Sequence, residues 1–244
     1  AAAGMVPFCN IYSTFMQRAY DNVIHDVAIQ GLPVVMCLDR GGLVGEDGVT
    51  HHGLFDMAAF AAVPGLTIAA PMDERELRNL MYTALHAGKP FMIRYPRGGG
   101  AGAAWEGMPF ETLPEGRGRR LRTGSDVALL TVGTTGNAGA RAAERASAAG
   151  TSVAHYDLRF VKPLDEELLD EVGRTFRRVV TVEDGCLRGG VGEAVAAFFN
   201  RRGHDVAVRT LGIGDAWIDH GTPAELYALC GYDEEGILRA LTER

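Results

Sequence analysis

A loop rich in glycine and in side chains that can move protons is the first feature of this 244-residue sequence. Between residues 38 and 56, five glycines would let the backbone approach a ligand closely. An imidazole beside a carboxylate handles protons well near neutral pH. A plain surface loop is one alternative, and a metal site is a weaker one because the spacing matches no fixed ligand pattern. The side chains concerned are Arg40, Glu46, Asp47, His51 and His52.

A second polar stretch, residues 11–20, places aromatic rings next to a cation. Tyr12, Phe15 and Arg18 are spaced three residues apart, so Phe15 and Arg18 share one face of a helix. An aromatic ring and a guanidinium just beyond a strand suit a flat heteroaromatic ligand that carries an anionic group. The alternative is that Phe15 belongs to the core and Arg18 is a surface cation.

Arginines also mark the third stretch, Arg94–Gly98, where three consecutive glycines begin. The planar guanidinium binds a carboxylate or a phosphate through two parallel hydrogen bonds. A solvated strand exit is the alternative for this stretch taken alone. Together, Arg40 and Arg97 at neighbouring strand ends predict one small, anionic and phosphorylated substrate.

The elements that hold these stretches are predicted to alternate between strand and helix. Continuous apolar runs predict covered strands, and apolar residues at helical spacing predict the helices between them. Parallel βαβ units follow, and ligands bind at the carboxyl ends of such strands. In the first half, strands are expected at 7–11, 33–38, 66–70 and 91–95, and helices from Ser13 or Thr14 to Gly31, at 54–62, and from the cap Asp73 to 87.

Residues 98–122 interrupt this alternation with glycines, prolines and the basic run Arg117–Arg120. We expect a linker there, with its charges solvated. The predicted fold class is α/β, with two parallel-type domains at 1–97 and 123–244. In the second domain, strands are expected at 127–132, 153–157, 179–183 and 206–211, helices at 137–149, 165–175, 191–202, 223–229 and 234–241, and C-caps at Gly150, Gly203 and Gly231.

The composition argues against several classes of protein. Lys+Arg number 24 and Asp+Glu 31, so the net charge is −7, and the isoelectric point near 5.5 argues against nucleic-acid binding and a polybasic membrane anchor. No apolar run approaches the ~20 residues of a membrane span. The cysteines, Cys9, Cys37, Cys186 and Cys230, form no Cys-x-x-Cys pair, so neither a zinc site nor a disulfide framework is expected. This use of cysteine fits a protein of the reducing cytoplasm.

Three groups in the second half have a structural interpretation that we favour over a catalytic one. The segment Gly133–Gly136 has the form of a phosphate-binding turn, but no complete nucleotide motif accompanies it, so we expect a tight turn between strand and helix. Glu183–Asp184 and Asp219–His220 resemble acid–base pairs, and we expect structural roles for both.

The polar stretches together resemble the 1-deoxy-D-xylulose-5-phosphate synthase family, which are thiamine-diphosphate enzymes of the transketolase-like group. The resemblance spans essentially the whole chain. Gly41 stands where the family often has Ala, and His52 fills a variable position, so His51 is the matching histidine. The matching segments are 12–21, 25–30, 39–51, 94–98, 159–165 and 180–184.

This resemblance implies the condensation of pyruvate with D-glyceraldehyde 3-phosphate to 1-deoxy-D-xylulose 5-phosphate and CO2, a step toward isoprenoids, thiamine and pyridoxal. It implies a partial pyrimidine-binding domain followed by a transketolase-like C-terminal domain, a homodimer, and thiamine diphosphate with Mg2+ as cofactors. By motif position, Tyr12 and Phe15 would contact the cofactor, Arg40, Arg97 and Tyr12 the substrate, and Arg18, Asp47 and His51 would form the catalytic polar network, with no metal ligand in this chain.

The N-terminus leads us to expect an upstream domain. Residues 7–11 have the pattern of a strand buried on both faces, yet little sequence precedes them. In the family, the glutamate that activates the aminopyrimidine and the ligands of magnesium and diphosphate lie upstream of the matching segments. We therefore expect the C-terminal part of a synthase, inactive without its upstream domain in cis or in trans. The alternatives are a β-type subunit of a split thiamine-diphosphate enzyme (2-oxo acid dehydrogenase or transketolase) and a non-catalytic dimerisation fragment.

Overall fold

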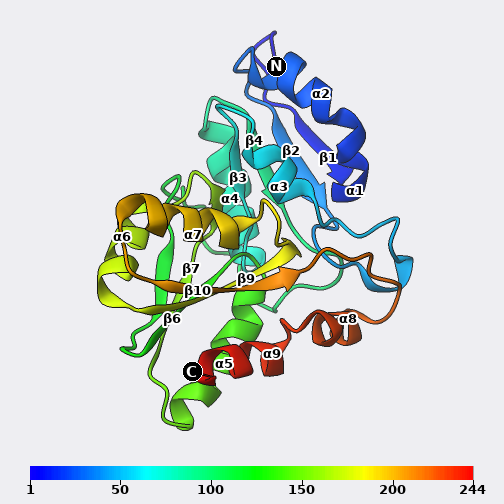
Figure 1. Ribbon diagram of the computed structural model, residues 1–244. Coiled ribbons are helices and arrows are strands. Elements are labelled where there is room, and N and C mark those ends of the chain that lie inside the picture. Colours follow the sequence, from blue (N-terminus) through cyan, green and yellow to red (C-terminus); the bar gives the residue numbers. More distant parts are fainter. Residues whose placement is uncertain (244) are drawn as a thin grey trace.

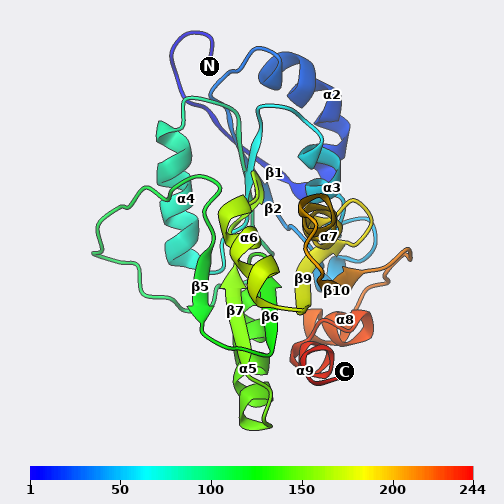
Figure 2. The same ribbon diagram turned by 60° about the vertical axis from the view of Figure 1, so that its left-hand side comes forward.

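The computed structural model describes residues 1–243, which form two five-stranded sheets covered by helices on both faces (Figure 1). The blue and cyan segment up to residue 94 supplies four strands of the first sheet. The green to red segment forms the second sheet and its helices (Figure 2). The α/β fold class predicted from the alternation of elements is confirmed.

The first sheet is parallel except for one strand. Its order is β1 (Phe8–Tyr12), β2 (Val35–Asp39), β4 (Phe91–Arg94), β3 (Thr67–Ala69) and β8 (Phe160–Lys162). Strand β8 comes from the second half of the chain and pairs antiparallel with β3. The expectation that the first strand is buried on both faces is wrong for β1, whose Cys9 and Asn10 are exposed. The reason is its edge position, where only β2 flanks it.

Helices cover both faces of the first sheet. The region predicted as one helix is helical but irregular, because α-, 3-10 and π-type turns follow one another in α1 (Ser13–Met16), η1 (Gln17–Ala19), α2 (Tyr20–Asn22) and η2 (Val23–Ala28). Neither Ser13 nor Thr14 caps it, since Tyr12 occupies the N-cap position. Helix α3 (Asp56–Ala61) packs on the same face. Helix α4 (Glu74–His86) packs on the other face and is capped by Asp73, as predicted.

The second sheet has one antiparallel edge strand. Its order is β10 (Ala207–Ile213), β9 (Arg178–Cys186), β6 (Val127–Thr131), β7 (Val153–Asp157) and β5 (Arg119–Arg122), and only β5 is antiparallel. Alternate residues of each strand face opposite layers. One layer contains α6 (Glu166–Thr175) and α7 (Val191–Arg202), and the other contains α5 (Thr135–Ala148), α8 (Pro223–Cys230) and α9 (Glu234–Thr242).

Two of the three glycines predicted as C-caps occupy that position, whereas α5 has Ala149 as its C-cap and Gly150 follows it with φ 95°. Gly203 and Gly231 end α7 and α8 in the left-handed conformation. Gly133 begins the turn into α5 with φ 63°, and a Cβ there would lie 3.2 Å from Cβ of Ala70. The turn therefore packs tightly against the first half, in agreement with the structural interpretation of Gly133–Gly136.

The predicted linker ends in a strand. Residues 119–122 form β5 and pair with β7, so the second sheet begins inside the segment expected to be irregular. The basic run is also not simply solvated. Arg117 forms ion pairs with Asp165 and Glu167, and the side chain of Arg119 is only 33% exposed.

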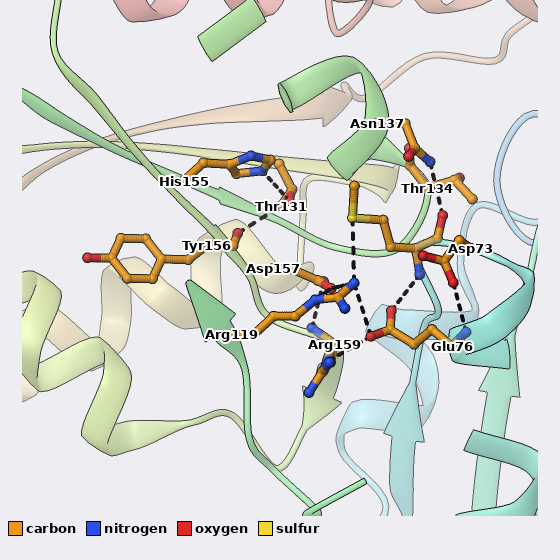
Figure 3. Close-up of polar contacts among 11 residues, drawn as sticks. Asp73, Glu76, Arg119, Thr131, Thr134, Asn137, His155, Tyr156, Asp157 and Arg159 are labelled. Carbon is orange, nitrogen blue, oxygen red and sulfur yellow. Dashed lines mark hydrogen bonds and ion pairs between the residues drawn. The ribbon is translucent and has the colours of Figure 1, made fainter. Parts of the chain in front are cut away.

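Arg119 belongs to an ion-pair cluster that joins helix α4 of the first half to the second sheet (Figure 3). Its Nη2 lies 3.2 Å from Oε1 of Glu76 and 3.0 Å from Oδ2 of Asp157, and Arg159 Nε donates to Glu76 at 2.6 Å. Burial, followed by the charge of Glu76, raises the pKa of Asp157, and Arg119 opposes this shift. Because both carboxylates are buried, the guanidinium of Arg119 offsets much of the cost of their desolvation.

The largest core cluster is shared by the two halves. Met57 and Phe60 of α3 belong to the same cluster as Leu130 of β6 and Phe198 of α7. The two sheets are thus held by apolar contact as well as by the ion pairs. No helix within residues 1–243 combines the length and the apolar character needed to cross a lipid bilayer.

We expect Arg119→Met to lower the free energy of unfolding by ~3 kcal/mol, because it leaves two buried carboxylates without their shared cation. Arg120→Met is the matched control, since Arg120 is the next residue of β5 and its pair with Glu171 is exposed. It should cost less than ~1 kcal/mol. Urea denaturation of both variants at neutral pH measures the difference, and equal costs would contradict the role assigned to Arg119.

Candidate active site

The glycine-rich loop leaves the carboxyl end of β2 and returns to it. Gly42 and Gly53 exchange both backbone hydrogen bonds at 2.8 Å, which closes the loop at its base. Between them, η3 (Gly45–Asp47) forms one short helical turn. Arg40 has φ 59°, an uncommon conformation for a residue with a side chain. The loop therefore presents its polar residues from a closed and locally strained frame.

The aromatic residues predicted to bind a ligand lie together at the edge of this loop. The rings of Tyr12 and Phe15 are stacked with centroids 5.4 Å apart, and His51 approaches Phe15 edge-on at 5.5 Å. The guanidinium carbon of Arg40 lies 3.9 Å from the centroid of Tyr12. Phe15 is 37% exposed, so it is not the core residue of the alternative interpretation. Tyr12 ends β1 and Phe15 follows it, while Arg40 and His51 follow β2, so neighbouring parallel strand ends bring them together.

Asp47 lies between the two arginines expected to bind an anion. Its Oδ2 is 3.5 Å from Nε of Arg97 and 4.0 Å from Nε of Arg40. Arg97 also donates from Nη1 to the carbonyl oxygen of Val44 at 3.2 Å. One carboxylate thus holds two guanidinium groups on the same side of the loop.

Hydrogen bonds within residues 1–243 satisfy only part of the Arg40 guanidinium. Its Nη1 donates to Oδ2 of Asp39 at 2.6 Å. Its Nε is buried, and within residues 1–243 no acceptor lies within hydrogen-bond distance of it. A buried donor without an acceptor is costly, so this N–H suits an anionic ligand.

Arg18 and His51 border the aromatic pair. The guanidinium carbon of Arg18 lies 6.0 Å from the centroid of Phe15, at the outer limit of a cation–π contact. Nδ1 of His51 lies 2.9 Å from Oγ1 of Thr50, and the imidazole is half-buried. The structure therefore collects the residues assigned from the family motifs into one connected group with Arg18 at its margin, namely Tyr12, Phe15, Arg18, Arg40, Asp47, His51 and Arg97.

Arg94, paired with Arg97 in the sequence argument, has a different environment. It is 6% exposed and donates from Nε to Oδ2 of Asp56 at 2.8 Å. Its Nη2 donates to the carbonyl oxygens of Gly53 and Asp184 at 3.2 and 2.9 Å. Burial opposes its charge, but Asp56 and Asp184 outweigh that effect and raise the pKa of Arg94. Arg94 is therefore a structural cation and not part of the exposed anion site.

Asp184 connects the second half of the chain to the glycine-rich loop. Its Oδ1 accepts from the backbone N–H of Leu43 at 3.0 Å and from the hydroxyl of Tyr232 at 2.8 Å. A Cβ at Gly42 would lie 2.0 Å from Oδ2 of Asp184, so only glycine fits there. Burial raises the pKa of Asp184, while Arg94, Tyr232 and Leu43 lower it. The loop base is thus bound to β9 by a buried carboxylate.

Glu183, the neighbour of Asp184, caps helix α7. Its two carboxylate oxygens accept the backbone N–H groups of Val191 and Gly192, each at 2.8 Å. Burial raises the pKa of Glu183 to about 7, although both hydrogen bonds lower it. The contacts of Glu183 and Asp184 agree with the structural role expected for this pair.

Three residues that hold the site were missed by the sequence argument, namely Asp56, Asp184 as an anchor of the loop, and His52. His52 was set aside as variable, but it is 2% exposed and hydrogen-bonded at both ring nitrogens. The sequence signal that could have found it is the pair His51–His52 itself, because two adjacent side chains usually point in different directions and one of them can then face inward. Among residues 1–243, no three His, Cys, Asp or Glu side chains are grouped to hold a metal ion.

Two family models match the chain in consecutive parts. The transketolase pyrimidine binding domain matches residues 1–101, and the transketolase C-terminal domain matches residues 116–237. The chain belongs to the transketolase family.

Within this family, the chain is similar to 1-deoxy-D-xylulose-5-phosphate synthases over its whole length. The identity is 59% with the synthase of Bacteroides fragilis, 58% with that of Bacteroides thetaiotaomicron and 45% with that of Aquifex aeolicus. In each case the match covers 100% of this chain and 38% of the relative, so the chain spans well under half of their length. The resemblance drawn from the motifs is confirmed.

A solved structure shows the same fold. A chain described as "Split gene transketolase, inactive beta4 tetramer" matches 99% of this transketolase-family chain and 76% of its own length, with a TM-score of 0.85 and 24% identity. At that identity the match establishes the arrangement of the two sheets and their helices.

Glu183→Gln tests the buried carboxyl through the pH dependence of stability. Because the folded-state pKa of about 7 lies above the ordinary value of 4.5, the folded protein keeps a proton that the unfolded chain loses. This contribution to stability is fully present below the ordinary pKa and is lost as pH rises through the folded value. Relative to Glu183→Gln, the wild type should lose about 2 kcal/mol of unfolding free energy between about pH 5 and about pH 8, measured by urea denaturation. A constant difference across this range would contradict the assignment.

Proposed function

We propose that this chain contributes the pyrimidine-binding and C-terminal domains of an enzyme that condenses pyruvate with D-glyceraldehyde 3-phosphate to 1-deoxy-D-xylulose 5-phosphate and CO2. The observation that carries the proposal is the connected group of an exposed aromatic pair and two arginines around Asp47. The identity of 45–59% to named synthases over the whole chain supports it.

The aromatic pair suits the aminopyrimidine of thiamine diphosphate. Phe15 offers a partly exposed ring backed by Tyr12, and a flat heteroaromatic group stacks well on such a surface. When bound, this cofactor supplies the nucleophilic carbon and the electron sink that decarboxylation of a 2-oxo acid requires. We propose that the ligands of its diphosphate and of Mg2+ come from a further domain, in cis or in trans.

The two arginines suit the phosphate of the triose. Asp47 lies near both Arg40 and Arg97, and the buried Nε of Arg40 has no acceptor within hydrogen-bond distance among residues 1–243. A phosphate dianion accepts from several guanidinium N–H groups at once. Asp47 balances the two cations before the phosphate arrives and keeps both side chains on one side of the loop. Tyr12, in contact with Arg40, orients that guanidinium through its ring face.

His51 is the group best placed to move a proton. Its imidazole makes a T-shaped contact with Phe15 and belongs to the same glycine-rich loop as Asp47. We assign it proton transfer at the oxygen of the reacting carbonyl, with Arg18 and Asp47 completing the polar network that orients the substrates.

We further propose a cytoplasmic homodimer, with the domain limits 1–97, 98–122 and 123–244 predicted from the sequence.

A split enzyme is the second candidate. This chain matches 76% of a solved chain whose description is a split gene transketolase, which favours an arrangement with the remaining domain on a second polypeptide. In that arrangement the same site would serve a transketolase or a 2-oxo acid dehydrogenase.

Reconstitution distinguishes these functions. The part of the Bacteroides fragilis synthase that this chain does not match is supplied as a fusion and, separately, as a second polypeptide. We expect release of 14CO2 from [1-14C]pyruvate that depends on D-glyceraldehyde 3-phosphate, and none from this chain alone. Turnover of ketose donors without pyruvate would overturn the synthase assignment, and no turnover in either format would favour a non-catalytic dimerisation fragment.

Arg97→Ala tests the phosphate site in the reconstituted enzyme. Loss of a guanidinium that bonds a charged group should raise the KM for the triose phosphate roughly 10- to 100-fold and change the KM for pyruvate less than about 3-fold. Arg75→Ala is the matched control, because Arg75 is exposed on α4 and paired only with Glu111 within residues 1–243. Equal effects on both substrates would remove Arg97 from the phosphate site.

A further inference from the structure

His52 is a buried imidazole whose two nitrogens have distinct partners. The backbone N–H of Val44 donates to Nδ1 at 3.1 Å, so Nδ1 is an acceptor. The proton of the neutral ring then resides on Nε2, which lies 3.3 Å from the carbonyl oxygen of Asp219 and donates to it. The ring therefore connects the glycine-rich loop to a segment 167 residues further along the chain.

Val44 links this imidazole to Arg97. The N–H of Val44 is bonded to His52, while its carbonyl oxygen accepts from Nη1 of Arg97 at 3.2 Å. Arg97 is otherwise held only by Asp47 within residues 1–243, at the longer distance of 3.5 Å. The two hydrogen bonds lie on either side of the Val44 Cα, so a displacement of the Val44 backbone would change the position of the Arg97 guanidinium.

The segment 219–223 supports the same part of the loop by packing. A Cβ at Gly45 would lie 3.0 Å from Cδ of Pro223, and a Cβ at Gly48 would lie 3.3 Å from Cβ of His220. In Figure 1 the light-blue loop after β2 lies beside the orange segment that leads into α8. The second half of the chain therefore forms one wall against which the loop and the ring of His52 rest.

We propose that His52 is a positioning residue for phosphate recognition, acting through Val44 to orient Arg97 against a wall supplied by residues 219–223. The inference rests on the proposed function, since it assigns the phosphate of the triose to Arg97. It gives the second half a part in substrate recognition, although none of its side chains belongs to the proposed catalytic group.

Two conservative variants separate the two hydrogen bonds of the ring. His52→Asn retains an acceptor near the position of Nδ1, and His52→Gln retains a donor near the position of Nε2 but offers Val44 no matching acceptor. In the reconstituted enzyme, His52→Gln should raise the KM for the triose phosphate roughly 5- to 10-fold, with less than about a 2-fold change in kcat and in the KM for pyruvate. The KM of His52→Asn for the triose phosphate should stay close to that of the wild type, because its side chain still offers an acceptor to Val44. His86→Asn is the matched control, because His86 is exposed at the end of α4.

A double-mutant cycle decides whether His52 acts through Arg97. In the Arg97→Ala background, His52→Gln should have no further effect on the KM for the triose phosphate. Additive effects, or an equal rise in the KM for pyruvate, would overturn the proposal and leave His52 as a general structural residue. Urea denaturation of each variant shows whether the fold is retained, and His52→Ala, which also removes the acceptor for the Val44 N–H, replaces His52→Gln if that variant does not fold.

A measurement without turnover keeps this inference separate from the proposed function. In the 244-residue chain, hydrogen exchange of the Val44 amide should be faster in His52→Gln than in wild type and close to wild type in His52→Asn. Inactive reconstituted wild type together with this exchange pattern would reject the synthase function and retain the link from His52 to Val44. Unchanged exchange in His52→Gln would overturn the link itself.

Discussion

The buried guanidinium of Arg94 is the constraint on which the rest of the structure depends. An unpaired cation at 6% exposure would cost several kcal/mol, so the chain must bring acceptors to it. Those acceptors come from two segments that are distant in sequence from Arg94. One supplies the carbonyl oxygen of Gly53 and the carboxylate of Asp56, and the other supplies the carbonyl oxygen of Asp184. Satisfying this one group therefore fixes the end of the glycine-rich loop, the start of α3 and the contact with the second sheet.

The candidate site follows from that fixed base. With Gly53 held by Arg94 and Leu43 held by Asp184, the loop between them has little freedom in where it begins and ends. Its polar residues then project toward the aromatic pair after β1, because β1 and β2 are adjacent parallel strands. Arg40 combines a strained backbone with a buried Nε that has no hydrogen-bond acceptor among residues 1–243, a combination that agrees with the proposed anion site.

In the proposed site, the first half supplies the reactive side chains and the second half fixes where they lie. Family membership alone does not explain why a transketolase-type C-terminal domain should lie against a glycine-rich loop. The contacts do, since Asp184, the Asp219 carbonyl and the ion pairs around Arg119 each fix a different part of the first half. None of these groups needs to touch a substrate to affect how one is bound. Substitutions at them would disturb binding through geometry and stability together.

The sequence by itself determined the alternation of strands and helices, the family motifs, and the gathering of the site residues from Tyr12 to Arg97. These follow from local periodicity and from the rule that parallel strand ends meet at one edge. Only the tertiary structure decided which of two similar neighbours is exposed. Arg94 is buried while Arg97 is available, and His52 is buried while His51 faces Phe15. The physical reason is that burial of a polar group depends on the partners that reach it, and these partners come from distant parts of the chain.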